Sequence, residues 1–197
     1  MTTPTIEPLR PLPEVRRFLA GRRSRPAKTL RAPAPDRAAL ERILEVALRV
    51  PDHGKLEPWR LVVLGGAALQ RLGALAEARA AEIAPDKAPK LAAQFRDAPL
   101  VVAVVAAPEP SEAIPEIEQT LSAGALCLAL LNAAHAEGWG ANWLTGAVAY
   151  DEAFLRGGLG LEPSQWVAGF VVIGTEGAVP PERPRPDLAR IIRWVDR

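Results

Sequence analysis

The chain has 197 residues, of which 49% are hydrophobic and 24% charged, and its formal net charge is +1. This length is enough for one sizeable core, and the near balance of acids and bases gives no reason to expect nucleic acid as a partner. The single cysteine, Cys127, excludes an intramolecular disulfide and implies no oxidising compartment. No stretch reaches the roughly 20 apolar residues that cross a bilayer, so we expect a soluble cytoplasmic protein without a membrane partner.

Hydrophobic periodicity and breaker residues divide the chain into alternating helices and strands. Residues 1–12 contain three prolines and little periodicity, which predicts a flexible arm before a single domain over 13–197. Asp36 is typical of a helix N-cap. In chain order we predict helix 13–21, helix 37–49, strand 59–64, helices 67–84 and 87–96, strand 100–107, helix 114–137 and strand 166–174.

The helix over 114–137 is the feature that bears most on assembly. It is acidic at its start and almost wholly apolar after Leu121. A helix that is hydrophobic all round needs burial on every side, which favours burial partly against a second subunit. The tail over 179–197 is Pro-rich and ends in a short amphipathic stretch, so it could pack on its own body or on a neighbour. Few strands among many helices indicate an α+β or three-layer fold.

Arg22, Arg23 and Ser24 follow the first predicted helix. They offer a planar guanidinium fork, a second positive charge and a short hydroxyl donor, which together suit a phosphate. The alternative is a solvated cationic helix end that complements the helix dipole.

Residues 49–60 combine the end of a helix, a polar loop and the start of a strand. Arg49 lies in the last turn of the helix, where a cation also suits the dipole. His53 lies in the loop itself, where apolar packing does not explain it. Loops held between rigid elements are favoured positions for ligand contacts, and a structural hydrogen bond is the alternative for His53.

Other motifs are weaker. The chain contains no Walker loop and no G-x-G-x-x-G after a strand, and its two histidines lie too far apart to indicate a metal site. Cys127 and His135 lie in the long apolar helix and fit core positions. Residues 139–146 place two tryptophans between glycines and predict a loop that can cover the face of a flat ring, or else a plug for the core.

Four segments match one family in order and spacing. They are RRS at 22–24, RVPDHGKLEPWRLVV at 49–63, SAGALCLALLNAAHAEGWGANWLTGA at 122–147 and VAGFVVIGT at 167–175. The chain resembles the FMN-dependent nitroreductase family, especially its compact YdjA-like branch. It differs from most of the family at Glu57, where an amide is usual.

The resemblance implies a three-layer α/β/α sandwich with a small mixed sheet flanked by helices. It also implies a homodimer that packs about the long buried helix and holds FMN at the subunit interface. Carried over, the phosphate and ribityl chain would contact Arg22, Arg23 and Ser24, with Arg185 loosely matching a further basic residue. The flavin would be lined by Arg49 and His53, and by Trp143, Leu144 and Thr145 from the other protomer. A nicotinamide contact carries over to Ala133, Ala134, His135, Ala136, Glu137 and Gly138.

The activity implied by the resemblance is an NAD(P)H oxidoreductase. FMN would be reduced by NADH or NADPH and reoxidised, in a ping-pong sequence, by a small aromatic, quinone or nitro acceptor. The flavin carries the chemistry, so no side chain is assigned as catalytic and no metal is expected. Two alternatives stay open: a flavin-binding protein without turnover, and a flavin-consuming or substrate-dehydrogenating enzyme of the same fold.

Overall fold

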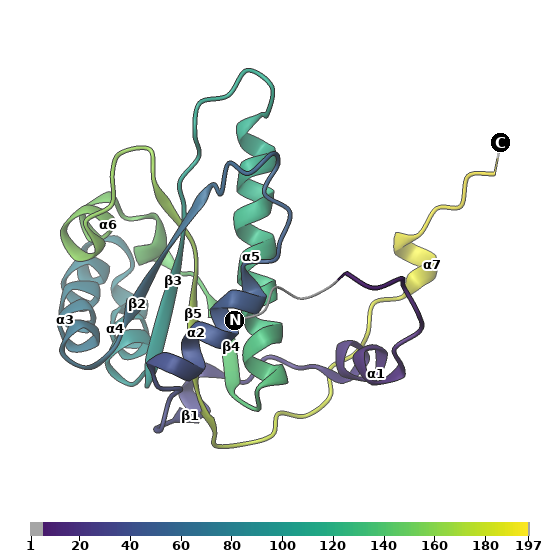
Figure 1. Cartoon of the computed structure of the whole chain (residues 1–197). Helices are drawn as coiled ribbons and strands as arrows, with labels where there is room; N and C mark the ends of the chain where they lie inside the picture. The colour runs from purple at the N-terminus through teal and green to yellow at the C-terminus, as the bar shows by residue number, and fades with distance from the viewer. Residues whose placement is uncertain (1–5, 197) are drawn as a thin grey trace.

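The computed structural model describes residues 6–196, which form a three-layer sandwich with two helices standing apart from it (Figure 1). The elements, in chain order, are α1 (Pro13–Gly21), η1 (Ala27–Thr29), β1 (Leu30–Arg31), α2 (Arg37–Ala47), β2 (Trp59–Leu64), α3 (Gly66–Ile83), η2 (Pro85–Lys87), α4 (Ala88–Arg96), β3 (Leu100–Ala106), α5 (Glu116–Ala136), β4 (Gly140–Leu144), η3 (Ala147–Tyr150), α6 (Glu152–Leu159), β5 (Trp166–Glu176) and α7 (Leu188–Ile191).

The sheet is antiparallel at every pairing, so the expectation of a mixed sheet is wrong. β3 lies between β2 and β5, and β1 and β4 pair along the other edge of β5. The reason lies in the connection between β2 and β3. Helices α3 and α4 connect the two strands and bring the chain back to the end of β2. β3 therefore starts beside the end of β2, with Leu64 opposite Val101. The chain must therefore run back along β2.

Helices cover both faces of the sheet, which accounts for the unbroken apolar run of β3. Alternate residues of β3 enter two separate cores. One core lies under α3, α4 and α6, where Phe95, Phe154 and Phe170 meet with ring centroids 5.1 to 6.4 Å apart. The other lies under α2 and α5 and contains Cys127. The three-layer α/β/α prediction is confirmed.

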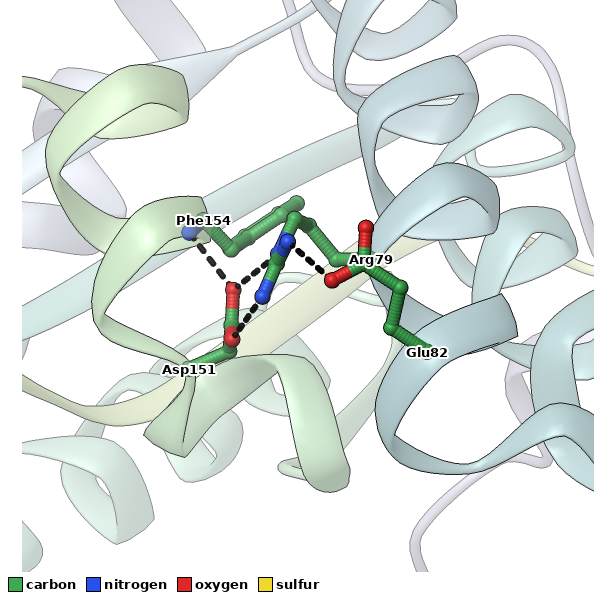
Figure 2. A network of polar contacts seen from close by, with 4 residues as sticks. All are labelled: Arg79, Glu82, Asp151 and Phe154. Carbon is green, nitrogen blue, oxygen red and sulfur yellow. Dashed lines mark hydrogen bonds and ion pairs between the residues drawn. The ribbon is translucent and has the colours of Figure 1, made fainter.

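An ion pair joins α3 to the start of α6 (Figure 2). Arg79 contacts both carboxylate oxygens of Asp151, with Nε–Oδ1 at 2.9 Å and Nη2–Oδ2 at 3.0 Å. Asp151 Oδ1 also accepts from the backbone N–H of Phe154 at 2.7 Å and so caps α6. The hydrogen bond from Arg79 is the main reason that the pKa of Asp151 lies below its usual range.

Long apolar side chains stay exposed on α5. Ile117, Leu121 and Leu128 are 61%, 64% and 44% exposed and lie on the face turned away from the sheet. By length and hydropathy α5 could also cross a membrane, but half of its apolar window is buried in the protein. That burial matches the core helix of a folded domain.

The two ends of the chain also expose apolar residues. Helices α1 and α7 lie together on one side, away from the sandwich (Figure 1). Exposed side chains include Leu19 of α1, Ile191 of α7 and Trp194, three residues after α7. The arm predicted over 1–12 has no regular secondary structure from residue 6 onward, and residues 1–5 lie outside the described part of the chain, as does residue 197 of the tail.

Residues 139–146 do not form the predicted loop, because residues 140–144 pair with β5 as strand β4. Gly140, one of the glycines that suggested a loop, serves close packing instead, as does Gly169 on the neighbouring strand. A Cβ on Gly140 would lie 2.5 Å from Leu30 Cδ2, and a Cβ on Gly169 of β5 would overlap the indole of Trp143. Glycine in a strand often marks such a close approach.

Candidate functional site

A cluster of arginines gathers where α1 ends. The chain turns extended at Arg22, whose N–H donates to Phe18 O, and Arg22 Nη2 donates to Ser24 Oγ at 3.3 Å. The C-terminal tail brings Arg185 to the same place, where its Nη2 donates to Ala20 O at 3.0 Å. We call Arg22, Arg23, Ser24 and Arg185 the cationic cradle. The structure therefore brings together the four residues that the sequence assigned to a phosphate.

Among residues 6–196, Arg22 and Arg23 of the cradle have no carboxylate partner, whereas Arg185 Nη2 lies 3.2 Å from Glu182 Oε1. Burial, and then the charges of Arg185, Arg23 and Arg25, lower the pKa of the Arg22 guanidinium. Within residues 6–196, the buried Nε atoms of Arg22 and Arg23 have no hydrogen-bond partner, and neither residue has a carboxylate within ion-pair distance. Buried donors without partners are costly, and an anionic group is an acceptor that would suit these guanidinium groups.

Arg25 differs from Arg22 and Arg23 because, like Arg185, it has a carboxylate partner. Its Nε lies 2.6 Å from Glu176 Oε1. The N–H does not point at that oxygen, which has no hydrogen bond, so we treat the contact as an ion pair. The backbone of Arg25 is tied to β4: its N–H donates to Ala141 O at 2.9 Å, and Asn142 Nδ2 donates to Arg25 O at 2.7 Å. Strand β4 is thus fastened beside the cradle.

His135 also lies at the cradle, which its sequence position did not indicate. Its Nε2 lies 3.3 Å from Ala141 O. Burial is the main cause that lowers the pKa of His135, and the charges of Arg22 and Arg25 lower it further. The imidazole is therefore neutral at pH 7.

The other residues carried over as a nicotinamide contact divide into two groups. The side chains of Ala133 and Ala134 are buried in the core under α5. They have almost no surface to offer a nicotinamide. Ala136, Glu137 and Gly138 are exposed at the end of the helix.

Trp143 is fixed at the edge of the sheet. Its indole lies over Gly169, its Nε1–H donates to Ala168 O at 3.1 Å, and 37% of the residue stays exposed. Leu144 and Thr145 follow it at the end of β4 and are partly buried. An anchored aromatic side chain with an open edge can form a fixed wall for a flat ligand.

Arg49 and His53 occupy a different region. Arg49 is exposed just after α2, and His53 lies in the loop before β2. His53 Nδ1 is 3.2 Å from Glu118 Oε2, in the first turn of α5. His135 lies in the last turn of that helix, seventeen residues later, which at 1.5 Å per residue is about 25 Å away. Within one chain the loop and the cradle are therefore separate.

Comparison with known proteins identifies the family. Residues 19–175 match the nitroreductase family. YdjA of Escherichia coli (strain K12), provisionally named an NAD(P)H nitroreductase, is 38% identical over 161 residues, which are 80% of this chain and 86% of YdjA. The chain therefore belongs to the nitroreductase family.

Solved structures share the fold. A nitroreductase-like family protein from Bacillus cereus superposes with a TM-score of 0.80 at 22% identity, over 100% of this chain and 99% of that one. A variant of NfnB from Sphigopyxis sp. strain HMH, described as an FMN and NADPH-dependent nitroreductase, gives a TM-score of 0.71 at 21% identity, over 92% and 98% of the two chains.

Proposed function

We propose that this protein is a homodimeric, FMN-dependent NAD(P)H oxidoreductase of the cytoplasm. The observation that carries the proposal is the pair of buried, unpartnered guanidinium nitrogens on Arg22 and Arg23, beside Arg185. Their chemistry fits the phosphate of a mononucleotide. The names of the relatives support the same cofactors, because NfnB is described as FMN and NADPH-dependent and YdjA as an NAD(P)H nitroreductase.

The residues of the chain have distinct tasks in this proposal. Arg22, Arg23 and Arg185 neutralise the phosphate, and Ser24 donates its hydroxyl. Bound FMN would supply the redox chemistry, hydride uptake from NAD(P)H and then delivery to a small aromatic, quinone or nitro acceptor in a ping-pong sequence. The protein positions the ring and shields it from water. No side chain of the site needs to act as acid or base.

Two chains are needed to complete each site. The loop that carries Arg49 and His53 lies about 25 Å from the cradle along α5, too far for one mononucleotide to contact both within a chain. The exposed apolar stripe of α5 offers the surface for a second copy. We infer that the loop of one protomer lines the flavin held by the cradle of its partner, opposite the wall formed by Trp143, Leu144 and Thr145.

The absorbance spectrum of the purified protein tests the proposal. We expect a yellow protein that is bleached by NADH or NADPH without oxygen and recovers its colour when a quinone or nitroaromatic is added. Yellow protein that no nicotinamide bleaches would favour flavin binding without turnover. Colourless protein that cannot take up added FMN would refute the proposal.

A further inference from the structure

The loop between α2 and β2 has a strained backbone. His53, Lys55 and Glu57 all have positive φ, at 53°, 64° and 46°, and Gly54 between them has φ of 81°. Residues other than glycine are uncommon in this region. Such conformations persist only where the surrounding structure determines them, and they cluster at functional sites. Within the loop, Lys55 N donates to Asp52 Oδ1 at 3.2 Å, and contacts from outside the loop add to this restraint.

Ser122 of α5 holds both ends of this loop. Its hydroxyl donates to Pro51 O at 2.6 Å, and its Oγ accepts from Trp59 Nε1 at 3.0 Å. Pro51 comes just before the strained residues and Trp59 just after them. One buried hydroxyl thus joins the beginning of the loop, its end and the long helix.

Gln119, one helical turn earlier, holds the neighbouring loop in the same manner. Its Oε1 accepts from Glu109 N at 2.8 Å, and its Nε2 donates to Glu109 O at 2.8 Å and to Ile114 O at 3.3 Å. The two loops are adjacent, since a Cβ on Gly54 would lie 3.5 Å from Ile114 Cδ1. Gln119 therefore supports the strained loop indirectly, by holding the neighbouring loop that packs against it.

These two residues are exceptional in α5. Within residues 6–196, Gln119 and Ser122 are the polar side chains that are buried, at 2% and 3% exposure. Both lie on one face of a helix whose other buried residues are apolar. The side chains of both form hydrogen bonds with the loops at the N-terminal end of this helix. Helix stability does not require them, because apolar residues fill the equivalent positions further along, such as Leu126 and Leu130.

We propose that Ser122 is a positioning residue that holds His53 in place for the flavin, with Gln119 supporting it through the adjacent loop. The inference rests on the proposed function, because it takes His53 as a wall of the flavin site. Ser122 touches no ligand itself. Its effect on flavin affinity must therefore pass through the loop and depend on His53.

Flavin titration of Ser122→Ala tests the inference, with FMN affinity measured by quenching of flavin fluorescence. We expect FMN to bind about tenfold more weakly, which equals about 1.4 kcal/mol. Thr175→Val is the matched control, because Thr175 Oγ1 also donates to a proline carbonyl, that of Pro33, at 2.8 Å. It removes the same type of bond elsewhere and is expected to leave FMN affinity within twofold of wild type.

A double-mutant cycle distinguishes positioning from general destabilisation. In a His53→Ala background, Ser122→Ala is expected to weaken FMN binding by less than twofold, because the group that it positions is gone. In an Arg22→Ala background its full effect is expected, because Arg22 binds the opposite end of the ligand. Equal effects in all three backgrounds, or unchanged affinity in the single variant, would overturn the inference.

Trp59→Phe provides a second variant if Ser122→Ala does not fold. It removes the hydrogen bond to Ser122 Oγ and keeps the aromatic packing, and it is expected to weaken FMN binding by about threefold, or about 0.65 kcal/mol. Unchanged FMN affinity in a folded Trp59→Phe protein would also count against the inference. Wild-type protein that binds no FMN would refute the proposed function itself, whereas wild-type binding that Ser122→Ala leaves intact would refute the positioning role alone.

Discussion

Replacing Arg22 with alanine should separate the recognition of the phosphate from that of the flavin ring. A hydrogen bond from a charged donor contributes about 1.5–3 kcal/mol. Arg22 is also repelled by Arg185, Arg23 and Arg25 in the free protein, and a bound anion eases this repulsion. A net loss of about 2 kcal/mol follows, which weakens FMN binding roughly 30-fold. Riboflavin, which lacks the phosphate, should lose less than threefold.

Isothermal titration of both ligands at two salt concentrations is the assay. The loss of FMN affinity caused by Arg22→Ala should be smaller at high salt, since salt screens these partly exposed charges. Arg17→Ala is the control, because Arg17 lies on α1, five residues before Arg22, and among residues 6–196 its ion pair is with the exposed Glu14. Removing Arg22 should not destabilise the free protein, since it relieves repulsion. Equal losses for FMN and riboflavin, or an Arg17 effect as large as that of Arg22, would refute the phosphate role.

Three further predictions concern packing and ionisation. Asp151→Ala should lower the free energy of unfolding, measured by urea titration, by about 2–3 kcal/mol through the lost cap and ion pair, and Asp151→Asn should lower it by less because it keeps the cap. The pKa of Asp151 is lowered in the folded protein. The stability that Asp151 contributes should therefore be full above its unfolded pKa of about 3.9 and be lost as pH falls through the folded pKa. Gly169→Ala should displace the Trp143 indole and cost about 1–3 kcal/mol, measured by urea denaturation; no change would contradict the packing. Burial raises the pKa of Cys127 to about 12, so iodoacetamide should label it only after unfolding, as mass spectrometry would show.

Helices α1 to α5 and the central strands could be predicted because each has a local signal, whereas the short helices α6 and α7 were not predicted. Helix α1 has the predicted bounds, and Asp36 Oδ1 accepts from Ala39 N as an N-cap should. Strands β1 and β4 could not be predicted. β1 is only two residues long, and the glycines in and around β4 indicated a loop, whereas Gly140 makes room for Leu30 and for strand β5.

Part of the candidate site could be predicted from the sequence and part could not. The cradle could be predicted from Arg22, Arg23 and Ser24, because consecutive residues at a helix end are close in any fold. The place of His135 beside them could not, since it depends on where the end of α5 meets the start of β4. The backbone of the His53 loop was equally hidden, because His53, Lys55 and Glu57 carry no glycine-like signal for positive φ.

The distance between the two ends of α5 has a genetic consequence. If each flavin contacts the cradle of one chain and the loop of the other, each chain contributes a cradle to one site and a loop to the second. A mutation in either segment then impairs only one of these two contributions. A chain with Arg22→Ala and a chain with His53→Ala, expressed together, would form mixed dimers in which one site combines both undamaged halves. Two alleles that each bind FMN weakly would then complement each other, and the recovered FMN binding would be confined to the mixed dimers.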